Sequence, residues 1–344
     1  MHSIQREDIA FVHGSFDLKQ LEGKKILITG ATGLLGSSLV HTLLEWNKTA
    51  SEPIKIVASV RNPEKAEKIF PDGKKYSLEY LIGDVADIKA ENTGIDYIIH
   101  GASPTSSRAF VETPVEIAKT SLYGTINLLE LAKANNVKSF VFLSTMEVYG
   151  TPQTDDKIYE DRYPVQNVLN VRTCYPESKC MCENLCVSYA SEYGVPAKIL
   201  RLTQTFGPGI EYNDGRVFAE FARCVIEKRD IILKTKGETK RNYLYTADAV
   251  TAILTVLLGG ENGNAYNAAN EETYCSIYEM AQTAAALCEE KINVRIEENP
   301  NQNSGYAPTL KMNLSTEKLQ ALGWKPHYSM KQMYGRMIET MKKS

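Results

Sequence analysis

Short apolar segments alternate with longer amphipathic segments over the first 208 residues. Six apolar segments rich in β-branched residues predict buried strands. They lie at 24–30, 54–60, 76–85, 95–103, 138–145 and 197–209. Between them, segments 33–46, 121–137 and 177–195 carry apolar residues at helical spacing and predict helices. This alternation predicts an α/β fold with a doubly wound parallel sheet of the Rossmann type, covered by helices on both faces.

The alternation weakens in the C-terminal part of the chain. Segments 216–230, 241–260 and 315–326 predict helices and a short strand, separated by glycine and proline. We therefore expect three parts. They are an N-terminal extension of polar residues at 1–23, with room for a short helix, an NAD(P)-binding Rossmann domain at 24–208, and a smaller substrate-binding lobe at 209–344, partly interleaved with the Rossmann domain.

Composition and charge narrow the function. The 344 residues are 43% hydrophobic and 24% charged, with a net charge of −3, which is typical of a globular protein. Lys and Arg are dispersed, so we expect no nucleic-acid partner, and no apolar run approaches a membrane span. The charged N-terminus is unlike a signal peptide, which predicts a cytoplasmic protein. Seven cysteines, an odd number, favour free thiols. Cys180, Cys182 and Cys186 lack a completing partner, so we expect no metal site.

A glycine-rich turn follows the first predicted strand. "GATGLLG" places Gly30, Gly33 and Gly36 before a predicted helix. Without side chains, a phosphate can approach the backbone amides at the positive end of the helix dipole. The spacing differs from the standard dinucleotide fingerprint, but its place between strand and helix still favours a dinucleotide.

The end of the second predicted strand bears on the choice of cofactor. An acidic residue there would bind the adenosine ribose, but this chain has Arg61, with Lys65 and Lys68 nearby. A guanidinium suits a 2′-phosphate, so NADP(H) is favoured over NAD(H), which stays possible. Asp84, after the third strand, either holds the adenine amino group or serves as a turn residue.

Three residues suggest a catalytic set. Thr145 ends the fifth strand, and Tyr175 and Lys179 are spaced to share one face of a helix. An ammonium beside a phenol is expected to lower the pKa of the tyrosine, which can then exchange a proton while hydride moves to or from a nicotinamide.

The chain resembles the extended short-chain dehydrogenases/reductases of the nucleotide-sugar epimerase/dehydratase group over roughly residues 24–330. The motifs are "GATGLLG", "HGAS", "STMEVYG", "YPESK", "RLTQTFGPG", "YNDGRVF" and "RNYLYTAD". Within the group it most resembles UDP-glucuronate decarboxylases. The resemblance implies a homodimer paired through helices and a nucleotide-sugar or nucleotide-polyol substrate.

The resemblance also implies the site. Catalysis is expected from Thr145, Tyr175, Lys179 and Glu147. The substrate is expected at Ser103, Gln204, Arg216 and Arg241. Besides Tyr175, Lys179 and Arg61, the expected cofactor contacts are Gly30, Thr32, Gly33, Leu34, Leu35, Gly36, Asp84, Val85, Gly101, Ala102 and Ser103.

Some positions depart from the family pattern. Dehydratases carry Asp then Glu after the threonine, whereas this chain has Met146 and Glu147. A thioether cannot donate a proton, which puts that dehydration in doubt. Decarboxylases carry a basic Arg-Lys-Pro stretch where this chain has "SGYAPTLKMN" (304–313) without the arginine. Gln204 stands where relatives usually have asparagine. Glu147 is a retained base, a residue that orients a sugar hydroxyl, or a structural carboxylate near Tyr149.

Three functions follow from these features. The favoured prediction is net NADPH-dependent reduction of a carbonyl on a nucleotide-linked sugar or polyol, with Tyr175 as proton donor. The alternative is a redox-neutral epimerase, decarboxylase or dehydratase that retains NAD(P)+. The third is a non-catalytic dinucleotide-binding scaffold, against which the complete Thr145, Tyr175 and Lys179 set argues.

Overall fold

A seven-stranded parallel sheet forms the centre of the computed structural model, which describes residues 1–104, 107–163, 166–298 and 309–342. The strand order is β10-β6-β5-β4-β1-β2-β3, and every neighbouring pair is parallel. The expected doubly wound α/β sheet is therefore confirmed. The strands are β1 (Lys25–Thr29), β2 (Lys55–Val60), β3 (Leu78–Ile82), β4 (Tyr97–His100), β5 (Ser139–Thr145), β6 (Ala197–Leu202) and β10 (Ala265–Ala268).

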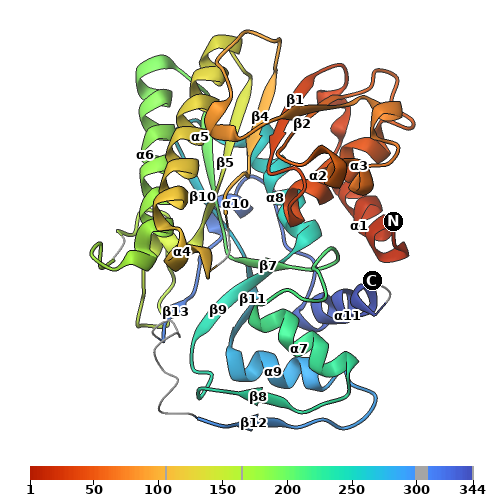
Figure 1. The fold of residues 1–344 in the computed structure, drawn as a ribbon, viewed down its shortest axis with the longest axis vertical. Coiled ribbons are helices and arrows are strands. Elements are labelled where there is room, and N and C mark those ends of the chain that lie inside the picture. Colours follow the sequence, from red (N-terminus) through yellow and green to blue (C-terminus); the bar gives the residue numbers. More distant parts are fainter. Residues whose placement is uncertain (105–106, 164–165, 299–308, 343–344) are drawn as a thin grey trace.

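Helices cover both faces of this sheet (Figure 1). Alternate side chains of β1 point to opposite faces, as the pleat requires. Ile26 and Ile28 join the cluster with α2 (Leu34–Trp46) and α8 (Thr246–Gly259), whereas Leu27 joins the cluster with α5 (Pro114–Asn135) and α6 (Cys174–Tyr193). Burial on both faces explains why these strands are continuous apolar runs rather than alternating ones.

The smaller lobe is built around β9 (Lys240–Tyr245). β7 (Gln204–Phe206), β11 (Asn270–Ser276) and β13 (Lys311–Met312) pair with it, and β8 (Ile231–Leu233) pairs separately with β12 (Val294–Ile296). Its helices are α7 (Val217–Ile226), α9 (Ile277–Ala285) and α11 (Met330–Met341). β10, α8 and the short α10 (Glu317–Gln320) lie against the Rossmann sheet although they follow residue 208, so the two halves interleave in space (Figure 1).

The N-terminal extension forms α1 (Ser3–Ser15), a helix that packs against α2 and α8. Arg336 of α11 holds α1 in place, because the Arg336 guanidinium contacts the carboxylates of Glu7 (2.9 Å) and Asp8 (2.8 Å). Asp8 also accepts a hydrogen bond from the Tyr245 hydroxyl (2.9 Å). These contacts join the two ends of the chain around the start of α8.

Two further short helices are α3 (Pro63–Ile69), which Asn62 caps, and α4 (Ala109–Glu112). Across the described ranges, none of the helices combines the length and apolar character that spanning a bilayer requires. Of the "SGYAPTLKMN" segment, residues 304–308 lie outside the described residues.

Candidate functional site

The glycine turn brings β1, α2 and β4 into close approach. Gly30 has φ +70°, and a Cβ on it would lie 2.7 Å from the carbonyl carbon of Gly101. A Cβ on Gly36 would overlap the Gly30 carbonyl. Glycine at both positions therefore lets α2 begin directly beside the end of β1. The N-terminus of α2, with Gly33 at its cap, is left facing the carboxyl edge of the sheet, where an anion is favoured.

A cavity of about 500 Å³ lies at this edge of the sheet. Such an edge is where ligands bind in doubly wound sheets. The cavity is lined by all the residues predicted to contact the cofactor: Gly30, Thr32, Gly33, Leu34, Leu35, Gly36, Arg61, Asp84, Val85, Gly101, Ala102, Ser103, Tyr175 and Lys179. Thr145, Gln204 and Arg216 line it too, whereas Glu147 and Arg241 lie just outside its lining.

The floor of the cavity is fixed by His100 at the end of β4. Its Nδ1 lies 2.8 Å from the Thr29 hydroxyl, which accepts a hydrogen bond from the Ala102 amide, and its Nε2 lies 3.2 Å from the Thr125 hydroxyl. Burial lowers the pKa of His100 to about 3, so the ring is neutral at ordinary pH. His100 thus helps to orient the backbone at Ala102 through the Thr29 hydroxyl.

Thr145, Tyr175 and Lys179 converge, although they come from different elements. Thr145 ends β5 and caps the following 3-10 turn by accepting a hydrogen bond from the Glu147 amide (3.2 Å). Tyr175 and Lys179 lie one turn apart at the start of α6, and both are buried. The Lys179 ammonium donates to the Leu143 carbonyl (2.8 Å) and lies 6.0 Å from the Tyr175 ring centroid.

The expected lowering of the Tyr175 pKa by Lys179 is wrong for this arrangement. Burial raises the pKa of Tyr175, and the Glu147 charge raises it further. A hydrogen bond with Thr145 and the charge of Arg172 act in the opposite direction. Burial also lowers the pKa of Lys179 to about 8. Both groups are taken out of water, and the ammonium is directed at a carbonyl rather than at the phenol, so desolvation outweighs their mutual attraction.

Glu147 is not packed as a structural partner of Tyr149. Its Oε2 accepts a hydrogen bond from Arg172 Nη1 at 3.0 Å, and both side chains are partly exposed. Tyr149 is engaged elsewhere, because its hydroxyl donates to Asn267 and accepts from Arg201. These contacts argue against Glu147 as a structural carboxylate near Tyr149. The Glu147 carboxylate lies close enough to Tyr175 to raise the pKa of the phenol.

The predicted substrate residues form two groups. Arg241 Nη1 donates to Gln204 Oε1 at 3.4 Å, and Arg241 Nε is buried with no hydrogen-bond partner among the described residues. A buried guanidinium nitrogen without an acceptor favours an anionic ligand at this place. Arg216 is instead paired with Asp214 (2.6 Å) at the start of α7, so an anion would have to compete with that carboxylate.

Arg61 and Asp84 lie close together in the lining of the cavity. The closest nitrogen of Arg61 is 4.0 Å from the Asp84 carboxylate, and the Arg61 side chain is 77% exposed. Asp84 Oδ1 also accepts a hydrogen bond from the Ala86 amide, the role of a turn residue, while its side chain faces the cavity.

A buried ion pair behind Thr145, Tyr175 and Lys179 was not foreseen from the sequence. Glu183, one turn after Lys179 on α6, accepts hydrogen bonds from Arg201 (2.7 Å) and from Ser144, the neighbour of Thr145. The pair ties α6 to β5 and β6 beneath the site. The only signal in the sequence was its spacing, a carboxylate four residues after Lys179.

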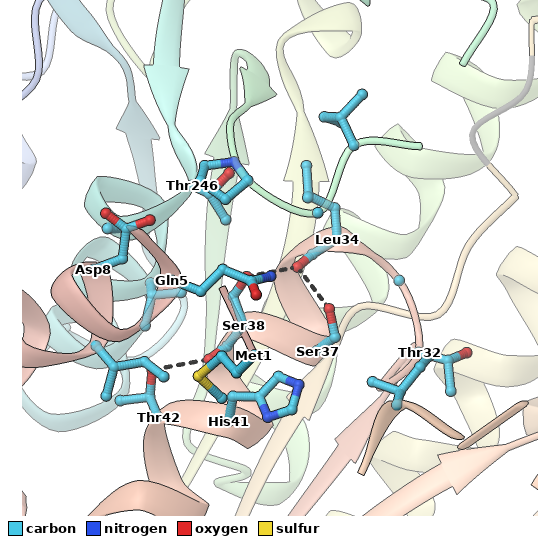
Figure 2. Close-up of a pocket in the computed structure, with 18 of the residues that line it drawn as sticks. Met1, Gln5, Asp8, Thr32, Leu34, Ser37, Ser38, His41, Thr42 and Thr246 are labelled. Carbon is cyan, nitrogen blue, oxygen red and sulfur yellow. Dashed lines mark hydrogen bonds between the residues drawn. The ribbon is translucent and has the colours of Figure 1, made fainter. Parts of the chain in front are cut away.

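A second cavity of about 440 Å³ lies on the other side of the glycine turn (Figure 2). Gln5 and Asp8 of α1, His41 and Thr42 of α2, and Thr246 of α8 surround it. Thr32, Gly33 and Leu34 line both cavities. The polar N-terminal extension therefore forms a wall next to the dinucleotide turn, which its composition did not predict.

Comparison with known proteins agrees with this geometry. The model of the NAD dependent epimerase/dehydratase family matches residues 26–269. UDP-glucuronic acid decarboxylase 5 of Arabidopsis thaliana is 29% identical over 322 residues, covering 90% of this chain and 86% of the relative. The dTDP-D-glucose 4,6-dehydratase of Mus musculus is 26% identical, covering all of this chain and 94% of the relative.

Solved structures agree on the fold. The UDP-glucuronic acid 4-epimerase of Bacillus cereus, solved in complex with NAD, superposes with a TM-score of 0.75 at 20% identity, covering 93% of this chain and 99% of that one. The chain therefore belongs to the NAD-dependent epimerase/dehydratase family of extended short-chain dehydrogenases/reductases, enzymes that act on nucleotide sugars.

Proposed function

We propose that the protein converts a nucleotide sugar by a redox-neutral reaction in which a retained NAD(P)+ oxidises the sugar transiently and the hydride is returned. The observation that carries this proposal is the single cavity lined by the glycine turn, Thr145, Tyr175, Lys179 and Gln204. The relatives, decarboxylases and a dehydratase by name, favour this reading over the net reduction that Arg61 suggested from the sequence.

The protein's own groups have distinct parts in such a reaction. Tyr175 exchanges a proton with the sugar oxygen, and Thr145 holds that oxygen and the phenol together. Lys179, fixed on the Leu143 carbonyl, places a positive charge near the site. Gln204 and Arg241 hold the nucleotide diphosphate, as the unpartnered Arg241 Nε supports. When bound, the dinucleotide supplies the hydride acceptor and donor.

The first test separates the two reaction types. The purified protein is denatured and the released dinucleotide identified, and the native protein is then incubated with UDP- and dTDP-linked sugars while NAD(P)H absorbance and products are followed. We expect a retained oxidised dinucleotide and product without net cofactor consumption. NADPH oxidation equal to product would establish net reduction instead.

Tyr175→Phe serves as the catalytic control in this assay. Loss of the proton-exchanging group should lower turnover by roughly 10²–10⁴-fold. Full activity in Tyr175→Phe, or a wild type that converts no sugar of the panel, would instead favour the hypothesis of a non-catalytic dinucleotide-binding scaffold.

We also propose a homodimer paired through α5 and α6. Exposed apolar side chains on these two helices support it: Val115 and Tyr123 on α5, and Met181 and Val187 on α6. Since the helices pack side by side on one face of the sheet, these side chains offer a surface for the same helices of a second copy.

A further inference from the structure

Arg172 lies three residues before Tyr175, in the 3-10 turn Val171–Thr173 that leads into α6. Its Nη1 donates to Glu147 Oε2 at 3.0 Å, with side-chain exposures of 37% and 30%. An ion pair this exposed contributes little to stability. Its position beside the candidate catalytic tyrosine therefore calls for a different explanation.

Phe110 joins the Arg172 guanidinium to the Tyr175 ring. The Phe110 and Tyr175 rings are stacked, with centroids 4.4 Å apart and an interplanar angle of 9°. The guanidinium carbon of Arg172 lies 5.7 Å from the Phe110 centroid, within range of a cation–π contact. Phe110 is fully buried in this cluster, so Arg172 is held by a fixed ring on one side and by Glu147 on the other.

The turn that carries Glu147 is fixed to the same site. The Glu147 amide donates to the Thr145 hydroxyl at 3.2 Å. Glu147 and Arg172 are also both close enough to Tyr175 to act on its pKa, in opposite directions. The ion pair therefore brings two opposite charges to the phenol, and loss of either one leaves the other uncompensated.

We propose that Arg172 is a positioning residue for the reaction. It holds the Glu147 carboxylate in one orientation beside Tyr175, where the carboxylate accepts a hydrogen bond or a proton from the sugar. Arg172 acts through Glu147 and needs no contact with the substrate. This inference rests on the proposed nucleotide-sugar function and applies to either of the two remaining roles of Glu147.

The test is a double-mutant cycle in the full-length protein, using the nucleotide sugar that the wild type converts. Arg172→Met and Glu147→Gln should each lower kcat by roughly 30-fold or more, with KM changed by less than about threefold. The double variant should be no slower than Glu147→Gln alone, because both substitutions remove the same interaction, the Arg172–Glu147 ion pair. Arg172→Lys, which keeps the charge, should recover part of the rate.

The response of kcat, KM and the melting temperature distinguishes positioning from a purely structural role. Loss of positioning should lower kcat with little change in KM or in the melting temperature, whereas a structural defect should lower the melting temperature as well. Arg108→Met is the matched control, since Arg108 forms an exposed ion pair with Glu112 (2.6 Å) on nearby α4. It should leave kcat and KM unchanged.

Different failures have different meanings. A wild type that converts no sugar overturns the proposed function together with this inference. An active wild type with additive losses in the cycle, or an Arg172→Lys variant that recovers none of the rate lost in Arg172→Met, overturns this inference alone. Should Arg172→Met fail to fold, Arg172→Gln removes the charge in its place, and melting temperatures within roughly 2 °C of wild type exclude unfolding as the cause.

Discussion

At the scale of single residues, we propose that Arg61 and Asp84 determine how the cavity binds the adenosine end of a dinucleotide. A 2′-phosphate would draw the exposed Arg61 guanidinium away from the Asp84 carboxylate, 4.0 Å from it. A free ribose hydroxyl would leave that pair in place. The guanidinium itself favours the 2′-phosphate.

Arg61→Ala tests this choice. If the phosphate is bound, removal of one exposed charge-assisted contact should weaken NADP(H) binding by about tenfold and leave NAD(H) nearly unchanged. Isothermal titration of the protein stripped of dinucleotide measures both affinities. Lys68→Ala, a nearby exposed lysine outside the cavity lining, is the control. Equal effects of Arg61→Ala on the two dinucleotides would remove Arg61 from a role in selecting the phosphate.

Some residues of the candidate site belong to a motif that can be read from the sequence, whereas others do not. Thr145, Tyr175 and Lys179 carry a recognisable spacing, and all three line one cavity. Arg172 and Glu183 have no motif of their own, because their partners, Glu147 and Arg201, lie 25 and 18 residues away in sequence. Only folding defines such pairs.

At the scale of elements, the start of α8 holds the C-terminal segment through Asp248. This fully buried carboxyl accepts hydrogen bonds from the amides of His327 (3.0 Å) and Tyr328 (3.1 Å). Burial raises its pKa to about 7, although these amides lower it and nearby Asp8 raises it.

The raised pKa of Asp248 gives a pH dependence with a definite sign. The folded state holds the proton up to about pH 7, whereas an unfolded aspartate releases it near pH ~4. Between these values the folded state binds more protons, so the free energy of unfolding falls as pH rises through this window. Burial also raises the pKa of Asp8, and this likewise makes the free energy of unfolding fall as the pH rises.

Asp248→Asn should flatten this slope by up to about 1.4 kcal/mol per pH unit, the contribution of one proton. Urea unfolding at a series of pH values from 4 to 7 measures it. Asp72→Asn, at an exposed position, should leave the slope unchanged. An unaltered slope in Asp248→Asn would show that the carboxyl does not titrate in this window.

At the scale of the whole molecule, the α5–α6 face is where a second copy is expected. Tyr123 is 54% exposed and Met181 is 49% exposed. A charge placed among apolar contacts is costly to desolvate. Tyr123→Glu combined with Met181→Glu should therefore convert the protein from twice its mass of 38.4 kDa to a monomer. Light scattering after gel filtration measures the mass.

Ile296→Glu is the control for the dimer, because Ile296 is a similarly exposed apolar residue on β12 of the other lobe. It should leave the mass unchanged. A wild type that already elutes as a monomer would refute the dimer, and a double variant that stays dimeric would place the interface elsewhere.

The sequence by itself determined the parallel sheet, the glycine turn and the spacing of Tyr175 and Lys179. The reason is physical: burial on both faces demands continuous apolar strands, and only glycine is tolerated at position 30, where a Cβ would lie 2.7 Å from the Gly101 carbonyl carbon. These requirements act on short segments, so they can be recognised in the amino-acid sequence of each segment.

Only the tertiary structure determined the pKa of the buried groups and the partner residues that each charged group contacts. Burial, not Lys179, sets the pKa of Tyr175, because desolvation depends on everything packed around the phenol. The Glu147–Arg172 pair, the Glu183–Arg201 pair and the docking of α1 on α8 join residues far apart in the chain. No local sequence pattern predicts these contacts, because they form only when folding brings distant segments of the chain together.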